Sequence, residues 1–173
     1  MPANDSTSST RESVSNEFSA RTLSPSLGPT GKRLDYITWH QHHMYMARML
    51  SEMSTEQKPN GCYIVDQEHY QIASGYAGEC ELEDAFCRCA TVSAFHKMER
   101  KTSHGEDFIM YITSLPECDT CLTRIPSMKV SKIWYWNSPV STEDSEVTSR
   151  LQALGIQCEK YEPTRTISID FHQ

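Results

Sequence analysis

The sequence of 173 residues lacks an excess of basic side chains, because its 16 Lys and Arg stand against 23 Asp and Glu and the formal net charge is −7. A protein that binds a nucleic-acid backbone needs the opposite balance, so we expect no strong nucleic-acid binding. No apolar run approaches the roughly 18 residues of a membrane span, and the N-terminus has no charged-then-apolar signal pattern. These absences favour a soluble intracellular protein, cytoplasmic or nuclear, that binds no membrane.

The sequence also lacks the even number of cysteines that a disulfide framework needs. It contains seven cysteines, and without a secretion signal this number is more typical of free thiols or metal ligands. The chain is long enough for one domain with a true hydrophobic core and a tail. The role of the cysteines is therefore the first functional question that the sequence raises.

The N-terminal residues 1–32 contain mostly Ser, Thr, Pro and Gly, with too few apolar groups to offset the entropy of ordering. We predict a disordered tail over residues 1–32 and a folded domain over residues 33–173. Hydrophobic periodicity in the domain predicts helices over 34–54, 89–101, 118–125 and 143–154 and strands over 62–65, 70–76, 108–113, 132–136, 156–161 and 166–171. This alternation predicts an α/β domain whose sheet is covered on both faces.

Three histidines, His40, His42 and His43, lie close together in the first predicted helix. His40 and His43 share a face of the helix at a spacing of three residues, but no Asp or Glu is placed to complete a metal site. We therefore interpret these histidines as surface or helix-packing residues.

The segment Cys118-Asp119-Thr120-Cys121 is a C-x-x-C motif that follows a predicted strand and opens a predicted helix. A helix N-terminus favours the thiolate form that a metal needs. The motif alone fits a redox pair, half of a zinc site or two buried thiols. Cys89 also opens a helix, so two adjacent helix N-termini would bring three sulfurs together, as at a catalytic zinc with an open fourth position. The pattern leaves metal ligands and buried thiols both open.

The sequence from Cys89 to Phe95, "CATVSAF", followed later by "PECDTC" at residues 116–121, resembles the cytidine and deoxycytidylate deaminase family. Nearly all of residues 34–171 can be laid along its deoxycytidylate branch. The resemblance implies a three-layer α/β/α cytidine-deaminase-like fold with a mixed sheet of about five strands. It implies Zn²⁺ as the cofactor, held by Cys89, Cys118 and Cys121. It also implies a homo-oligomer or a hetero-oligomer with a related deaminase.

The departures from the family pattern concern the reaction itself. Thr91 stands where the family has its catalytic glutamate, and a threonine hydroxyl is too weakly acidic to serve as a base near neutral pH. The resemblance places Ala77 and Ala90 at positions that line the family's substrate pocket. Ala77 stands where the family has a nucleotide-binding asparagine. The loop 79–86 is short and acidic and would repel a nucleotide phosphate. Glu117 separates Pro116 from the next cysteine and alters the corner of the base pocket.

The leading functional hypothesis is therefore a catalytically inactive deaminase-fold protein that binds zinc structurally and serves as a scaffold or partner subunit. One alternative is an active zinc hydrolase that deaminates dCMP or another cytosine nucleotide, with Glu83, Asp84 or Glu117 replacing the lost acid. A weaker alternative is a nucleotide-binding module without turnover. We expect oligomers to form through the helices that flank the metal site. Candidate contact residues are Ile125, Met128, Ile133, Trp134 and Trp136, although core burial would explain most of them.

Cys87 precedes Cys89 by two residues and allows two interpretations. As a fourth thiolate it would fill the position that water takes in an enzyme, which would make a closed, tetrahedral structural site. As a buried thiol under the preceding loop it would have no ligand role. We prefer the second interpretation from the sequence alone.

Overall fold

The computed structural model describes residues 27–31, 36–79, 87–100, 107–137 and 142–164. Its contacts divide the chain into two units, Met1–Tyr36 and Ile37–Gln173. Within the first unit, the amide of Gly31 donates to the carbonyl of Gly28 at 2.9 Å and closes a turn. The predicted disordered tail lies almost entirely outside the described residues, as do the predicted strand over 166–171 and most of the acidic loop 79–86.

The described residues of the second unit form nine elements, in the order that the sequence predicts for them. The helices are α1 (Trp39–Glu52), α2 (Ala90–Glu99), α3 (Asp119–Ser127) and α4 (Thr142–Ala153). The strands are β1 (Gly61–Val65), β2 (Gln71–Tyr76), β3 (Phe108–Ser114), β4 (Val130–Asn137) and β5 (Gln157–Lys160). None of the helices among the described residues has the length and apolar composition that crossing a membrane requires.

The first helix begins at Trp39, five residues later than the sequence predicts. Thr38 is its N-cap, and its Oγ1 accepts a hydrogen bond from the Gln41 amide at 3.2 Å. The Gln41 side chain in turn accepts from the Thr38 amide at 2.9 Å. This reciprocal capping box satisfies two backbone donors and fixes the start of the helix.

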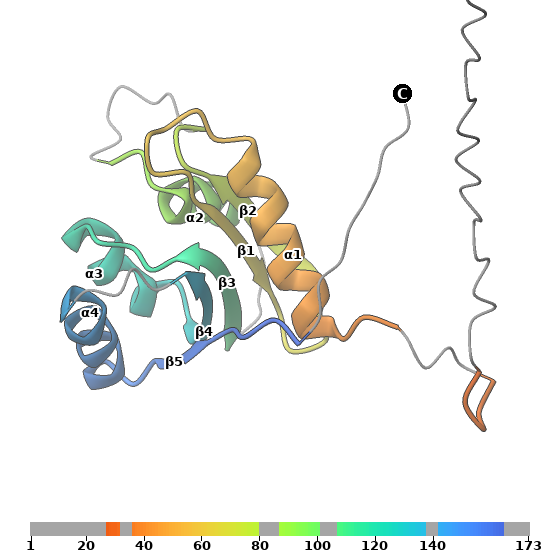
Figure 1. Cartoon of the computed structure of the whole chain (residues 1–173). Coiled ribbons are helices and arrows are strands. Elements are labelled where there is room, and N and C mark those ends of the chain that lie inside the picture. The colour runs from red at the N-terminus through yellow and green to blue at the C-terminus, as the bar shows by residue number, and fades with distance from the viewer. Residues whose placement is uncertain (1–26, 32–35, 80–86, 101–106, 138–141, 165–173) are drawn as a thin grey trace, which may run out of the picture. The chain divides into compact units, whose positions relative to one another are not determined.

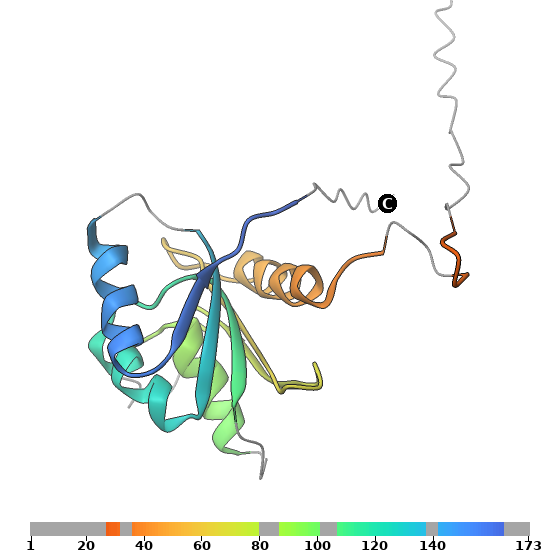
Figure 2. The same cartoon turned by 90° about the horizontal axis from the view of Figure 1, so that it is seen from below.

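The sheet has the strand order β2-β1-β3-β4-β5. Strand β1 is antiparallel to both of its neighbours, β2 and β3, whereas β3, β4 and β5 are parallel. The strands twist together in Figure 2, where β4 and β5 lie beside β3 at one side of the sheet. The predicted mixed sheet of about five strands is confirmed.

Helices cover both faces of this sheet (Figure 1). Helix α1 packs on one face, in a core cluster that includes Met44, Ala47 and Tyr111. Helices α2, α3 and α4 pack on the other face, in a larger cluster that includes Phe95 and Leu151. Two separate cores on opposite faces make a three-layer α/β/α domain, as predicted. Ile125 and Ile133, which the sequence offered as contact residues, are fully buried in the larger core.

A close approach of α2 to β2 sets the position of the first turn of α2. A Cβ atom added at Gly75 in β2 would lie 2.7 Å from the amide nitrogen of Ala94 and 2.9 Å from the carbonyl oxygen of Ala90. Real Cβ atoms do not come so near to backbone atoms, so only glycine permits this contact. The beginning of α2, with Cys89 immediately before it, is thereby held against the sheet.

Candidate metal centre

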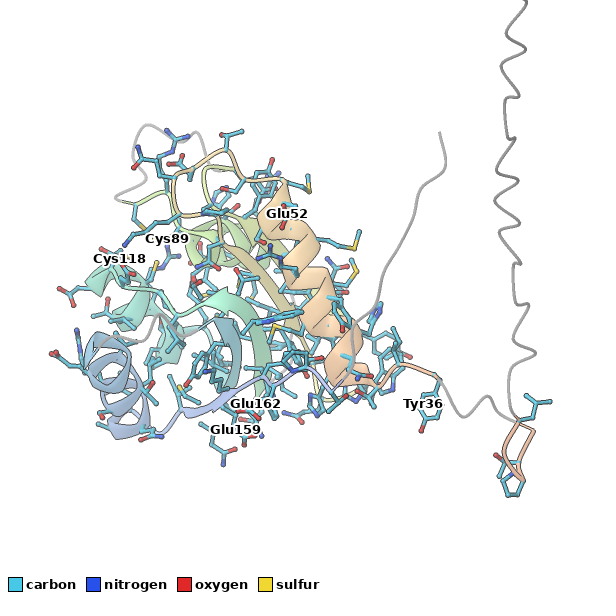
Figure 3. The ribbon with its side chains drawn as sticks, in the orientation of Figure 1. Tyr36, Glu52, Cys89, Cys118, Glu159 and Glu162 are labelled. Carbon is cyan, nitrogen blue, oxygen red and sulfur yellow. The ribbon has the colours of Figure 1, made fainter. Side chains whose placement is uncertain are left out.

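The N-termini of α2 and α3 meet beyond the carboxyl end of β3, and cysteines occupy both of them. Cys89 is the N-cap residue of α2 and Cys118 is the N-cap residue of α3. Neither side chain forms a capping hydrogen bond with its own helix, so both sulfurs can turn toward a common point (Figure 3). Cys121 lies in the first turn of α3 and is buried, and Cys87 lies in the segment that leads into α2.

Four sulfur atoms gather at this point. The Sγ atoms of Cys87, Cys89, Cys118 and Cys121 all lie within 4.8 Å of one another. Three of the separations are 3.5 Å: Cys87 to Cys121, Cys89 to Cys118, and Cys118 to Cys87. A disulfide would need about 2.05 Å, so these are free thiols. A tetrahedral Zn²⁺ with Zn–S bonds of about 2.3 Å needs sulfurs about 3.8 Å apart, and the group fits that ion.

The structure thus brings together the three cysteines that the sequence analysis offered as ligands. It also places Cys87 among them, where the sequence analysis preferred a separate buried thiol. The sequence signal for Cys87 was its C-x-C spacing with Cys89, which by itself did not show the direction in which the side chain points. The intervening Arg88 turns outward and pairs with Glu56 at 3.1 Å.

The four thiols share hydrogen bonds that favour one thiolate among them. A hydrogen bond with Cys121 is the main effect that lowers the pKa of Cys89 to about 6. Burial opposes this shift, and hydrogen bonds with Cys118 and Cys87 support it. Burial raises the pKa of Cys118 to about 11. Two effects raise the pKa of Cys121: the hydrogen bond with Cys89, which is the larger effect, and burial. Further negative charge in so small a volume requires a cation, because like charges at this separation repel strongly.

Thr91 lies in the first turn of α2 and is fully buried. Its Oγ1 has no hydrogen-bond partner among the described residues. Ala90 and Ala77, the other two residues at predicted pocket positions, are buried and offer no polar side-chain atom. The position that the resemblance assigns to a catalytic acid therefore holds a buried hydroxyl that has no hydrogen-bond partner in the described part of the chain.

The carboxylates near the centre are engaged elsewhere. Glu79 accepts hydrogen bonds from the Ser93 hydroxyl, the Lys97 ammonium and the Tyr76 amide. Burial alone would raise the pKa of Glu79, but the hydrogen bonds from Lys97 and Ser93 outweigh it and lower the pKa. Glu117 is exposed and pairs with Lys58 at 3.0 Å. No carboxylate of the described residues joins the sulfur group, and Glu83 and Asp84 lie outside the described residues.

The histidines of α1 form a packing cluster instead of a second metal group in the part of the chain that the structure describes. His43 is buried and stacks between Trp39 and Tyr63, with ring centroids 5.6 Å from each. His40 Nδ1 lies 2.7 Å from the Tyr111 hydroxyl oxygen. His69 also joins this cluster, with its Nδ1 3.3 Å from His43 Nε2. The sequence does not reveal this contact, because His69 belongs to a turn far from α1 along the chain.

Comparison with protein families gives a match over residues 37–137 to the cytidine and deoxycytidylate deaminase zinc-binding region. This segment includes all four cysteines of the sulfur group and covers more than half of the chain. A Caenorhabditis elegans relative, "Uncharacterized protein F10E9.7", is 56% identical over 130 residues, which is 75% of this chain and 99% of the relative. Deoxycytidylate deaminase of Schizosaccharomyces pombe is 28% identical over 149 residues, 73% of this chain, and the match spans only 45% of that enzyme.

Solved structures show the same fold. The dCMP deaminase of cyanophage S-TIM5 in complex with dCMP and dUMP superimposes with a TM-score of 0.60 at 24% identity, over 73% of this chain and 100% of the phage chain. A Thermotoga maritima diaminohydroxyphosphoribosylaminopyrimidine deaminase/reductase superimposes with a TM-score of 0.59 at 15% identity, over 70% of this chain and 36% of that one. At these identities the likeness concerns the fold alone.

Proposed function

Because the chain belongs to the cytidine and deoxycytidylate deaminase family, we propose that it is a non-catalytic member that binds one structural Zn²⁺ and serves as a subunit or scaffold. The ligands would be Cys87, Cys89, Cys118 and Cys121. The observation that carries the proposal is the fourth sulfur, which lies with the other three inside a sphere small enough for one ion.

A fourth thiolate matters because of what it displaces. Catalytic zinc sites in proteins have three protein ligands and leave one position for water or substrate, whereas structural sites are closed by four. Four thiolates around Zn²⁺ also leave a net charge of about −2, which opposes the formation of hydroxide at neutral pH. When bound, the ion would link the beginnings of α2 and α3 and supply folding free energy.

The residues around the sulfur group support the same conclusion. Deamination of a cytosine ring needs a group that moves protons between the attacking water, the ring and the departing ammonia. The buried hydroxyl of Thr91 cannot do this. Glu79 is bound by Lys97 and Ser93 on the side of α2 and is not free to replace it. Ala77 also replaces the family's nucleotide-binding asparagine, and its methyl group cannot form a hydrogen bond to a nucleotide.

A protein that keeps the deaminase fold but does not catalyse deamination can still function by binding a partner protein. We propose that it assembles with further copies of itself or with a related deaminase. The absence of a basic excess in the sequence is consistent with a protein partner and not with nucleic acid.

Metal analysis of the purified protein tests the closed site. We expect one zinc per chain, and we expect Cys87→Ser to lose most of it, because a site that needs four thiolates binds weakly with three. Cys158→Ser is the matched control, since Cys158 is also a half-buried free thiol but lies outside the group. Full zinc retention by Cys87→Ser together with loss by Cys89→Ser would show an open, three-ligand site and would refute the proposal.

An activity assay tests the loss of the reaction. The substrate to use is dCMP, the compound named for the phage structure, with cytidine and CMP in parallel, and the readouts are ammonia release and the ultraviolet change. We expect no release above that of a zinc-stripped sample. Turnover by the unmodified protein would establish the active hydrolase instead.

A further inference from the structure

Cys87 differs from the other three cysteines of the sulfur group in its backbone setting. Cys89 and Cys118 are the N-cap residues of α2 and α3, and Cys121 lies in the first turn of α3, so the helices fix the backbones of these three. Cys87 belongs to no helix or strand and is half-buried. Its backbone can therefore shift without breaking a helix.

Two contacts of Arg88 tether the segment that contains Cys87. The Arg88 carbonyl accepts a hydrogen bond from the Gly78 amide at 2.8 Å, and the Arg88 side chain pairs with Glu56 at 3.1 Å. This ion pair is open to solvent, because the Arg88 side chain is 64% exposed. Exposed ion pairs contribute little to stability, so the tether is a weak one.

Cys87 is also within reach of both cysteines of the C-x-x-C motif. Its Sγ lies 3.5 Å from that of Cys118 and 3.5 Å from that of Cys121. A disulfide bond measures about 2.05 Å, so an approach of about 1.5 Å would close it. Cys89 and Cys118 are also 3.5 Å apart, but the close contact at Gly75 holds the N-terminus of α2 in place. Cys87 is therefore the sulfur best placed to form a bridge.

We propose that the sulfur group is a peroxide-sensitive switch, in which hydrogen peroxide oxidises Cys87, Cys87 forms a disulfide with Cys118 or Cys121, and the metal ion is released. Accessible thiolates with a second cysteine beside them are the usual targets of such oxidation. The inference rests on the proposed function for the presence of Zn²⁺, and it names how the binding of that ion is regulated.

The reaction balances with one molecule of hydrogen peroxide. The Cys87 thiolate attacks one peroxide oxygen, the O–O bond breaks, and a sulfenic acid and a hydroxide ion form. The thiolate of Cys118 or Cys121 then attacks the sulfenic sulfur, the S–S bond forms, and a second hydroxide leaves. The two thiolates lose two electrons and the peroxide gains them. A dithiol reductant reverses the change by exchange with the disulfide.

The disulfide removes two of the thiolates that would bind the ion. Cys89 and one cysteine of α3 remain, which is half of a structural zinc site. The new bond joins the segment before α2 to α3, across 31 residues for Cys118 or 34 for Cys121. A disulfide across such a loop restrains the unfolded chain. We therefore expect the domain to stay folded while it loses the ion.

Peroxide treatment of the zinc-loaded, full-length protein tests the switch. The reduced protein is freed of reductant under nitrogen and mixed with hydrogen peroxide. A chromophoric zinc chelator measures the released ion, and iodoacetamide labels the remaining thiols. Digestion before aspartate and after lysine or arginine places each of the four cysteines of the sulfur group in a peptide of its own. Mass spectrometry of these peptides therefore identifies the bridge directly.

We expect release of all bound zinc, the loss of two of the seven thiols, and a bridge from Cys87 to Cys118 or Cys121. Dithiothreitol followed by added Zn²⁺ should restore the metal content. Cys158→Ser is the matched control, because Cys158 is also a half-buried free thiol but lies outside the sulfur group. The variant should release zinc at the same rate and form the same bridge. A slower release from it would assign the oxidation to Cys158 instead.

Retention of zinc in excess peroxide would overturn the proposal. A bridge that leaves Cys87 as a free thiol would do the same, whether it joins Cys118 to Cys121 or Cys89 to Cys118. Loss of the helical circular dichroism signal would also contradict it, because zinc release would then follow unfolding.

The zinc content before peroxide is added reports separately on the proposed function. A protein that holds one zinc and keeps it in peroxide retains that function without the switch. A protein isolated without zinc contradicts the proposed function itself and leaves the switch no ion to release.

Discussion

Replacing Thr91 by valine probes the position at which the family places its catalytic acid. Thr91 is fully buried and its Oγ1 has no hydrogen-bond partner among the described residues. An unsatisfied buried polar group costs about 1–3 kcal/mol, and valine has nearly the same shape and a similar helix propensity. We therefore expect Thr91→Val to raise the free energy of unfolding by about 1 kcal/mol. The corresponding rise in the melting temperature is about 2–4 °C for a chain of this size.

Thr113→Val is a control at an equally buried threonine whose hydroxyl is used. Thr113 Oγ1 donates to Asn60 Oδ1 at 2.7 Å and accepts from the Gly61 amide at 3.1 Å. Its removal leaves the Gly61 amide without this acceptor, while Asn60 Oδ1 still accepts from the Ser114 amide at 3.2 Å, and we expect a loss of about 1–3 kcal/mol. Urea unfolding of the zinc-loaded proteins measures both changes. If Thr91→Val is destabilised like Thr113→Val, the Thr91 hydroxyl has a partner in the folded protein, such as a metal-bound water, and the closed-site account fails.

Three further predictions address the site, the packing and the pH dependence. Thr91→Glu should release no ammonia from dCMP and should lose about 3–5 kcal/mol of stability, because it buries an uncompensated carboxylate; turnover above background would contradict this. Gly75→Ala should lose about 2 kcal/mol or more in urea unfolding through its clash with Ala94, whereas an unchanged midpoint would show that α2 moves freely. Burial, with help from His42 and His69, lowers the pKa of His43 to about 4. The unfolded chain therefore binds this proton first, and stability should fall as the pH drops from about 6.5 to 4. His43→Phe should lose that part of the pH dependence, and an identical profile would contradict the assignment.

The sequence was sufficient to predict the elements of the domain because each has a clear local signal. The apolar strand "FIMYIT" at 108–113 and the alternation of helices and strands predicted a covered sheet, and the structure confirms it. The start of α1 was predicted five residues too early because Leu34, Tyr36 and Ile37 continue the apolar periodicity. The capping box at Thr38 decides the boundary, and its hydrogen bonds do not appear in a hydrophobic pattern.

The candidate site was predictable where the cysteines occupy helix N-termini and less so elsewhere. Cys89 and Cys118 begin helices, so their directions could be inferred from the elements that they cap. Cys87 lies outside any helix or strand, and only the tertiary structure shows where its sulfur points. The engagement of Glu79 by Lys97 was missed for the same reason, since the two residues are 18 positions apart. From the sequence alone, Glu79 counts as one more repulsive charge of the acidic loop.

The polarity of α1 shows a different limit of sequence patterns. A helical apolar period identifies an amphipathic helix but does not say which stripe faces the core. In α1 the side chains of Trp39 and Met49 are more than half exposed, whereas three of the five buried residues, Gln41, His43 and Ser51, are polar. Gln41 and His43 have long-range hydrogen-bond partners, Thr164 and His69. The Ser51 hydroxyl instead donates to the Arg48 carbonyl of the same helix.

X-ray absorption at the zinc edge of the purified, unmodified protein tests the central claim most directly, because it counts the atoms bound to the metal. The account predicts four sulfur neighbours at about 2.3 Å, supplied by Cys87, Cys89, Cys118 and Cys121, with no oxygen or nitrogen ligand. Three sulfurs and one light atom at about 2.0 Å would contradict it, since such a site retains the position at which a deaminase activates water.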